Sequence, residues 1–269
     1  MDEIVFIRGG GDIATGVAHR LHRSGFRILL LEKEKPTVIR RTVSFAQAIF
    51  DGQIIVEGIK AIRVNKIEEM YNCWKENVIP IIIDEDLEVL RKIKPDVFVD
   101  GILAKENLGI TKDIAPLTIA LGPGFEAGVD VDIVIETKRG HYLGSIIYEG
   151  FAEPNSGIPG IINGFGHERV IKSPTKGEVK HASKIGDLVK ADDNIAYVGN
   201  VPVRAPIDGV LRGLIMEGLE IEEGLKMADV DPRGVREYCN SISEKAKAIG
   251  GGVLEAILFN KKKEMKRGY

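Results

Sequence analysis

The feature that most constrains the fold is a glycine loop near the start of the chain. The apolar run 4–7 leads through Arg8 into Gly9, Gly10 and Gly11, and apolar residues at helical spacing follow directly. A buried strand that enters a helix through Gly-x-Gly-x-x-Ala is typical of a dinucleotide-binding βαβ unit. Gly9 allows the tight turn, Gly11 lets the backbone approach a phosphate, and Ala14 keeps the helix near the strand.

Two acids complete this predicted site. A second strand over 26–31 ends at Glu32, 23 residues after Gly9, where an acid commonly bonds ribose hydroxyls. Asp12 lies in the loop itself, where a carboxylate repels a phosphate unless a cation intervenes. The alternative is that Asp12 caps the helix and that the glycines form a tight turn without a ligand.

The order of elements predicts an α/β fold. Strand-like and helix-like segments alternate as far as a strand over 117–121, which indicates a Rossmann-like parallel sheet in a domain of residues 1–165. Runs 131–136 and 143–148 follow without a helix between them and predict a strand pair. A segment rich in glycine and proline, 154–166, then indicates a linker.

Residues 166–234 predict a second, smaller β module. Its segment 174–179 recurs 32 residues later as 206–211, so two copies should pair into a pseudo-twofold structure. The pattern resembles the biotinyl/lipoyl barrel-sandwich hybrid. Since the turn 198–203 has no lysine, we expect neither biotin nor lipoate. Residues 235–269 predict a helical segment, divided by the triple glycine 250–252, and a basic tail.

Further candidate residues follow later strands. The carboxyl ends of parallel strands share one edge of a sheet, so the loops that leave them should rim the same crevice. Asp100 and Lys105 follow the strand over 97–99, and Gly122 and Gly124 follow the strand over 117–121. Each loop alone could equally be a simple turn.

Two charged groups are also candidates for cofactor binding. Arg40 and Arg41 could bind a phosphate through their guanidinium groups, or could simply be solvated. Glu136, Arg139 and His141 gather an acid, a cation and an imidazole between two predicted strands. This segment could contact a ligand or could be a charged hairpin tip.

Composition excludes several classes of protein. The net charge is −3, which does not favour nucleic acid, and the basic residues of 261–267 are interpreted as a solvated tail. Cys73 and Cys239 lie far apart, and no spacing of histidines or cysteines predicts a metal site. No signal peptide or membrane-spanning run is present, so we expect a cytoplasmic protein without a membrane partner.

Taken together, these motifs resemble accessory proteins of the selenium-dependent molybdenum hydroxylase system. The resemblance extends over nearly the whole chain and is specific in combination. The matching stretches are RGGGDIATG (8–16), IRRTVSF (39–45), DGILAK (100–105), LGPGF (121–125), IETKRGH (135–141), NSGIPG (155–160), RGLI (212–215), DVDPR (229–233) and AKAIGGGVLEA (246–256).

The resemblance implies a maturation factor for molybdenum hydroxylases that handles a molybdopterin-type cofactor or a selenium donor. It supplies no catalytic residues, and it favours a cofactor-binding protein over a turnover enzyme. The hydroxylase and other maturation proteins are the expected partners, and a homo-oligomer stays open. The alternative hypothesis is an NAD-dependent oxidoreductase, which rests on the glycine loop and Glu32.

Overall fold

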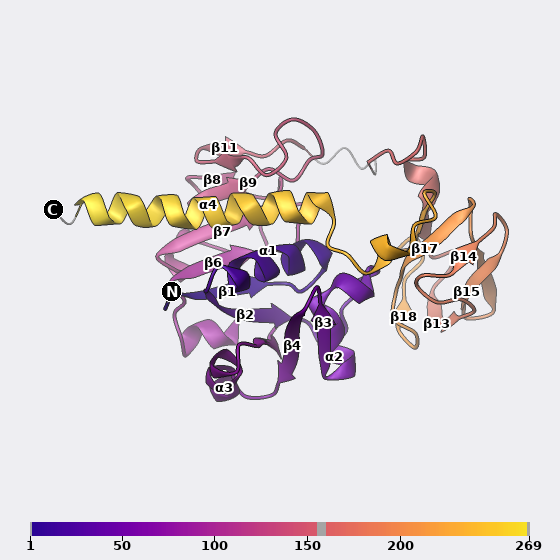
Figure 1. Cartoon of the computed structure of the whole chain (residues 1–269), viewed down its shortest axis with the longest axis horizontal. Coiled ribbons are helices and arrows are strands. Elements are labelled where there is room, and N and C mark those ends of the chain that lie inside the picture. Colours follow the sequence, from indigo (N-terminus) through magenta and orange to yellow (C-terminus); the bar gives the residue numbers. More distant parts are fainter. Residues whose placement is uncertain (1, 155–159, 268–269) are drawn as a thin grey trace. The chain divides into compact units, whose positions relative to one another are not determined.

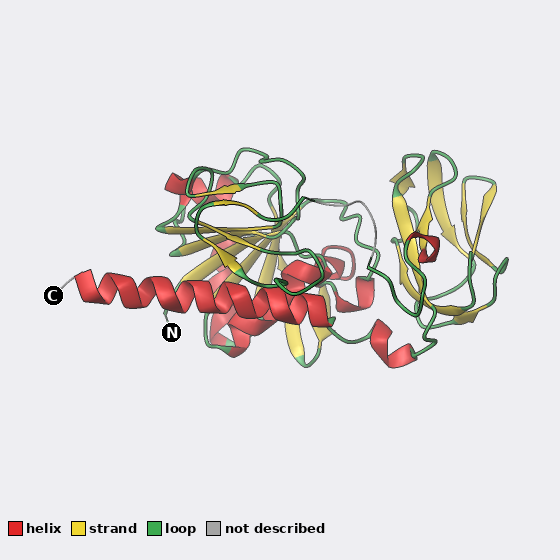
Figure 2. Ribbon diagram, turned by 90° about the horizontal axis from the view of Figure 1, so that it is seen from above, coloured by secondary structure: helices red, strands yellow, loops and turns green. Residues whose placement is uncertain are grey.

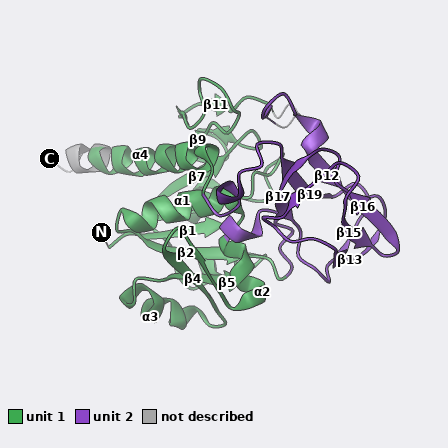
Figure 3. Ribbon diagram, turned by 45° about the vertical axis from the view of Figure 1, so that its right-hand side comes forward, with its two compact units in different colours: residues 1–34, 45–156, 242–269 green, residues 35–44, 157–241 purple. Residues whose placement is uncertain are grey.

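The computed structural model describes residues 2–154 and 160–267, with side chains as far as residue 262. The chain forms two compact units, and each is built from separate stretches of sequence. The first unit holds residues 1–34, 45–156 and 242–269, and the second holds residues 35–44 and 157–241 (Figure 3). The predicted parts 1–165, 166–234 and 235–269 are continuous. The structure differs at two stretches. Residues 35–44 belong to the second unit and residues 242–269 to the first, because each packs with a stretch that is distant in sequence.

The first unit is built on a nine-stranded sheet in the order β10-β9-β7-β6-β1-β2-β5-β4-β3 (Figure 1). The strands from β9 to β4 in this order are parallel, and β10 and β3 are antiparallel at the two edges. The prediction of an α/β fold with a mainly parallel sheet is therefore confirmed, as is the pair that 131–136 and 143–148 were expected to form. The strands are β1 (Ile4–Arg8), β2 (Arg27–Glu32), β3 (Gln53–Val56), β4 (Ile59–Val64), β5 (Ile79–Ile83), β6 (Val97–Asp100), β7 (Leu117–Leu121), β9 (Ile133–Ile135) and β10 (Ile146–Ile147), with β8 (Glu126–Ala127) and β11 (Gly150–Phe151) paired separately.

Helices cover both faces of this sheet. Phe6 of β1 and Leu29 of β2 pack in one cluster with Met70 of α3 (Met70–Lys75). Because side chains alternate along a strand, the intervening residues of β1 and β2 face the other side, where α1 (Asp12–Arg23) contacts both strands. The long helix α4 (Glu244–Arg267) contacts α1, β7, β9 and β10 and runs along the outside of the unit (Figure 2). A short helix, α2 (Ala48–Asp51), contacts β3, β4 and β5. Within the described residues, no helix is long and apolar enough to cross a membrane.

Glycines bring α4 close to α1. A Cβ added to Gly16 would lie 2.6 Å from the Cβ of Ala246, and one added to Gly250 would lie 2.8 Å from the carbonyl oxygen of Gly16. A Cβ on Gly252 would collide with the carbonyl of Gly144. The prediction that the triple glycine divides two segments is therefore wrong. The helix is continuous, and two of its glycines permit backbone contact at positions where a side chain has no room.

The second unit contains two four-stranded antiparallel sheets, ordered β12-β19-β17-β14 and β16-β15-β13-β18. Strands of the first repeat copy begin at residues 177, 188 and 194, and strands of the second begin 32 residues later at 209, 220 and 226. Each copy contributes its middle strand to the sheet of the other copy, which gives the pseudo-twofold arrangement expected from the repeat. The strands are β12 (Val170–Lys172), β13 (Gly177–His181), β14 (Leu188–Val189), β15 (Asn194–Val198), β16 (Val201–Arg204), β17 (Gly209–Leu214), β18 (Glu220–Ile221) and β19 (Lys226–Asp231).

Buried charges link the strands of the second unit. Asp231 accepts a hydrogen bond from Arg212 at 3.2 Å and from the Nη2 of Arg233 at 2.6 Å, and Asp229 pairs with the buried Arg169. Burial opposes ionisation of Asp231, but the bonds from Arg233 and the charge of Arg212 outweigh it and lower its pKa. The acids and arginines of 212–215 and 229–233 thus have a structural role in this chain.

Two neighbouring glycines of α4 should respond oppositely to alanine. Gly252→Ala places a methyl group against the backbone of Gly144, and overpacking of this kind costs about 1–3 kcal/mol. Gly251 has nothing within 4 Å of the added Cβ, so Gly251→Ala should stabilise the helix by about 0.5–1 kcal/mol. Urea denaturation measures both. Equal effects of the two substitutions would contradict the packing described above.

Candidate functional site

The first two glycines of the loop are required by their surroundings. Gly9 has a φ of +92° and donates its N–H to the carbonyl of Leu31 at 2.7 Å. A Cβ added to Gly9 would lie 2.9 Å from the Cγ2 of Ile102, which is too close for an ordinary contact. A Cβ on Gly10 would lie 2.8 Å from the backbone nitrogen of Ala46. Through these contacts the glycine loop packs against the end of β2, the loop after β6 and the segment that begins at Phe45.

The third glycine is different. Gly11 is the N-cap of α1, with a φ of −64° and a ψ of 176°, and no side chain caps the helix by a hydrogen bond there. Asp12 is the first residue of the helix, so the alternative in which Asp12 is the N-cap is wrong. Ala14 is fully buried, and its Cβ lies 3.0 Å from where a Cβ on Gly101 would be. The small residue keeps α1 close to the end of β6.

Glu32 binds the glycine loop directly. Its Oε2 accepts the N–H of Gly10 at 2.8 Å, and its Oε1 accepts the N–H of Lys33 at 2.9 Å. Burial raises the pKa of Glu32, although these hydrogen bonds partly oppose the shift. The carboxylate that was predicted to meet a ribose therefore lies beside the loop, where it already serves as a backbone acceptor.

Asp100 is the second carboxylate of this edge. It is fully buried at the end of β6 and accepts a hydrogen bond from Arg8 at 3.2 Å, across the β1–β6 pair. Burial raises the pKa of Asp100, and the positive charge of Arg8 opposes that rise. The ion pair fixes the side chain of Arg8 next to the start of the glycine loop.

The loops that leave successive strands contact one another along this edge. Gly9 lies against Ile102, and Gly124 lies against the backbone of Ala104 and Glu106. A Cβ on Gly122 would lie 2.9 Å from the Oγ1 of Thr137, which joins the next loop along. Lys105, in the loop after β6, is exposed. The structure thus brings the predicted strand-end loops together in the order of their strands.

The segment with Glu136, Arg139 and His141 is fixed by contacts with other residues of the first unit. Glu136 is buried, and its carboxylate accepts the N–H of Lys138 at 2.7 Å and that of Glu153 at 2.8 Å. Arg139 forms an ion pair with Glu244. His141 is exposed, and its ring lies edge-on to Tyr142, with 4.9 Å between the ring centroids. Glu136 and Arg139 thus fasten the segment, and His141 lies among its exposed residues.

Arg40 and Arg41 belong to the second unit. Arg40 is buried, and its Nη2 donates to the carbonyls of Tyr238 at 2.8 Å and Ser241 at 3.2 Å. Arg41 donates through Nε to the carbonyl of Leu214 at 2.7 Å. The alternative of a solvated pair is wrong for Arg40. Both guanidinium groups fasten residues 35–44 to the rest of their unit.

Sequence reasoning missed Thr15 as a support of the site. Its Oγ1 donates to the carbonyl of Gly10 at 3.1 Å and accepts the N–H of Phe45 at 2.8 Å, while the N–H of Ala46 donates to the same Gly10 carbonyl at 2.9 Å. A polar residue one turn inside a helix, on its buried side, was the available signal. The contact with Phe45 and Ala46 is long-range and has no local signature.

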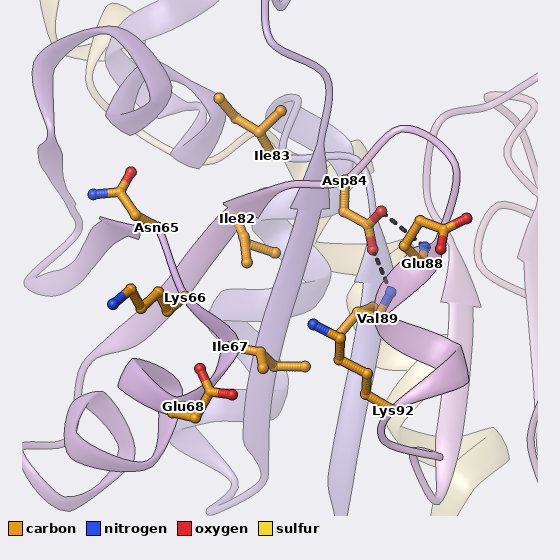
Figure 4. A pocket seen from close by; sticks show the side chains of 10 residues that line it. All are labelled: Asn65, Lys66, Ile67, Glu68, Ile82, Ile83, Asp84, Glu88, Val89 and Lys92. Atoms are coloured by element: carbon orange, nitrogen blue, oxygen red, sulfur yellow. Dashed lines mark hydrogen bonds between the residues drawn. The ribbon is translucent and has the colours of Figure 1, made fainter.

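A cavity of about 240 Å³ lies further along the same edge, where β4 and β5 end (Figure 4). Ile67, Ile82 and Val89 form its apolar part. The carboxylate of Asp84 accepts the N–H groups of Glu88 and Val89, both at 2.9 Å, and Glu88 pairs with Arg91 at 2.7 Å. Both acids thus hold the short helical turn 88–91 in place through contacts within the chain. Among the described residues, no group of three or more His, Cys, Asp and Glu side chains could hold a metal ion.

Comparison with known proteins gives one close relative in sequence. No family model matches the chain. The uncharacterized protein YqeB of Escherichia coli (strain K12) is 50% identical over 257 residues, which are 96% of this chain and 48% of YqeB. The chain therefore spans about half the length of the curated relative that it matches.

Similar solved structures are distant. The ectoine utilization protein EutE (DoeB) from Ruegeria pomeroyi, with product bound, is 13% identical, with 85% of each chain covered and a TM-score of 0.27. An aspartoacylase family protein from Mesorhizobium loti is 11% identical, with 86% of this chain and 85% of that chain covered and a TM-score of 0.27. At these TM-scores, neither likeness supports an argument about fold or function.

The raised pKa of Glu32 predicts how stability depends on pH. Since its pKa in the folded chain lies above the ordinary value of 4.5, the folded chain binds this proton more tightly than the unfolded chain. The contribution of Glu32 to the free energy of unfolding should therefore fall as pH rises from about 4.5 through the raised pKa. Glu32→Gln removes this titration, so the stability of the wild type relative to the variant should decline over that interval.

Urea denaturation at steps from about pH 4.5 to about pH 7.5 measures this difference. Glu34→Gln, which removes an exposed carboxylate from the same loop, controls for the change in net charge. A wild-type advantage that stays constant over the whole range would contradict the assignment.

Proposed function

We propose that the first unit binds a phosphorylated ligand, either a nucleotide or a molybdopterin-type cofactor, at the N-terminus of α1. The strand order supports the proposal, because β2 and β6 lie on opposite sides of β1. The chain leaves β1 through α1 toward β2, and a later segment returns on the other side, so the winding of the sheet reverses at β1. Ligands of open parallel sheets bind at such switch points, outside the carboxyl ends of the strands. In this proposal the unit is a Rossmann-like fold.

The observation that carries the proposal is the backbone of Gly11. Its φ and ψ are extended and open to any residue, whereas Gly9 needs its positive φ and Gly10 has no room beside Ala46. Glycine at position 11 adds no side chain at the start of α1, where the first N–H groups of a helix have no acceptor within the helix. Such N–H groups, with the helix dipole, favour a phosphate.

The biological role that we propose is maturation of selenium-dependent molybdenum hydroxylases. Its support is the resemblance of motifs from both units to the accessory proteins of that system. The chain would act as a cofactor-binding maturation factor, with the hydroxylase or another maturation protein as partner. The second unit would be a barrel-sandwich-like module with a structural or docking role, because its β15–β16 turn, at Gly199 and Asn200, has no lysine to modify.

An NAD-dependent oxidoreductase is the second candidate, and Glu32 is the observation that favours it. Its carboxylate lies at the end of β2, within 2.8 Å of the nitrogen of Gly10, where an acid could bond ribose hydroxyls. The two candidates differ in ligand, since the oxidoreductase requires NAD and the maturation factor a pterin or its nucleotide form.

Two substitutions at Gly11 test the proposed site. The conformation of Gly11 accepts any residue, so Gly11→Ala and Gly11→Asp should both fold with melting temperatures close to the wild type. A ligand at about 100 times its Kd stabilises the wild type by about 2.7 kcal/mol, which moves the melting temperature by a few degrees. We expect Gly11→Asp to abolish this shift, because its carboxylate would stand against the phosphate, and Gly11→Ala to reduce it.

Thermal-shift assays with NAD(H), NADP(H), ATP, GTP, CTP and molybdopterin-type ligands provide the measurement. A shift with NAD alone would favour the oxidoreductase, and a shift with a pterin or its nucleotide form would favour the maturation factor. A ligand that binds Gly11→Asp as tightly as the wild type would remove the site from the glycine loop.

A further inference from the structure

Helix α4 presents apolar side chains on two opposite sides. Val253, Ala256 and Ile257 are buried against the unit. On the outer side, Leu258 is 44% exposed and Phe259 is 45% exposed, although Phe259 also touches the ring of Tyr148. A helix at the surface of a globular protein ordinarily turns a polar face to water. The outer side of α4 therefore needs a different explanation.

Gly251 and Leu254, which are partly exposed, and Leu258 and Phe259, which are exposed, line a shallow groove of about 450 Å³. We call these residues the outer stripe, which consists of Gly251, Leu254, Leu258 and Phe259. Leu254, Leu258 and Phe259 follow Gly251 by three, seven and eight residues. This spacing places all four on one side of the helix, away from the buried side. Figures 1 and 2 both show α4 running along the outside of the unit.

Three charged residues also line the groove. Arg20 of α1 donates to the carbonyl of Lys247 at 3.4 Å, within its own unit. Glu255 and Lys262 belong to α4 and lie seven residues apart, which is about 10.5 Å along a helix. Leu258 and Phe259 stand at the midpoint between them. Among the described residues, neither Glu255 nor Lys262 makes an ion pair within the chain.

This arrangement is complementary to itself. If a second copy of α4 lies antiparallel on the stripe, with a twofold axis between residues 258 and 259, Glu255 of each copy faces Lys262 of the other. The same axis places Leu258 of each copy against Phe259 of the other. A contact of this kind uses the same patch on both subunits, as a twofold interface requires. The apolar centre excludes water, and the charges fix the antiparallel direction.

We propose that the outer stripe of α4 is the contact surface of a homodimer, with Glu255 and Lys262 paired across the twofold axis. One helical stripe is smaller than the 20–30 residues that each partner contributes to a standard interface. The dimer should therefore be weak and dependent on concentration. The proposal is independent of the ligand proposed for the glycine loop.

Charge exchange provides the decisive test. Glu255→Lys alone and Lys262→Glu alone each place two like charges opposite one another, so each should weaken dimerisation by about tenfold. The double variant Glu255→Lys/Lys262→Glu restores both pairs with reversed sign and should dimerise within about threefold of the wild type. Leu258→Glu, which puts charge at the apolar centre, should give a monomer.

Sedimentation velocity of the full chain, from about 1 μM to about 500 μM, measures the dissociation constants. Far-ultraviolet circular dichroism and melting temperature establish that each variant is folded, and Glu223→Lys on the second unit is an exposed control for the change in charge. A wild type that stays monomeric throughout would overturn the proposal. So would a dimer that Leu258→Glu leaves intact, or single-variant defects that the double variant does not repair.

Discussion

Close backbone contact around β1 and α1 is the constraint on which the first unit depends. Gly10 meets the backbone at Ala46, Gly101 lies against Ala14, and Gly16 meets Ala246 of α4. A side chain at any of these glycines would push apart a strand-end loop or a helix. Because glycine has no side chain, the glycine loop, the loop after β6 and the two helices form one tightly packed group. The start of α1 is therefore held rigidly, and rigid placement of N–H groups favours recognition of a phosphate.

The carboxylates of Glu32 and Asp100 set the electrostatics of the same edge. Glu32 is compensated by two backbone N–H groups, and Asp100 is compensated by Arg8. Both acids therefore have partners before any ligand arrives, which limits their repulsion of an incoming phosphate. Asp12, which the sequence placed in the loop or at the N-cap, is the first residue of α1. The Asp12 carboxylate repels an anion that binds here. The helix N-terminus would have to offset this repulsion, and a highly charged anion would also need a bound cation.

Local patterns predicted much of the fold, and long-range packing accounts for what they missed. The apolar runs and the glycine loop predicted β1, α1 and β2, because strand burial and helix spacing are local signals. The 32-residue repeat predicted that the second unit consists of two matched copies of short strands, paired in a pseudo-twofold arrangement. In contrast, Gly250–Gly252 read as a helix breaker, since glycine has low helix propensity, and the need for contact with Gly16 and Gly144 is not visible locally. The burial of Arg40 likewise depends on carbonyls about 200 residues away in sequence.

The central claim is that the start of α1 binds phosphate, and backbone amide chemical shifts test it most directly. In ¹H–¹⁵N spectra of the ¹⁵N-labelled full chain, titrated with pyrophosphate, the amides of Gly11, Asp12 and Ile13 should move and saturate. Amides of the second repeat copy in the second unit, such as Val210, should stay in place. If the loop amides do not move while others do, the phosphate binds elsewhere. If no amide moves up to about 10 mM pyrophosphate, well beyond a Kd of about 1 mM, the glycine loop has an architectural role only.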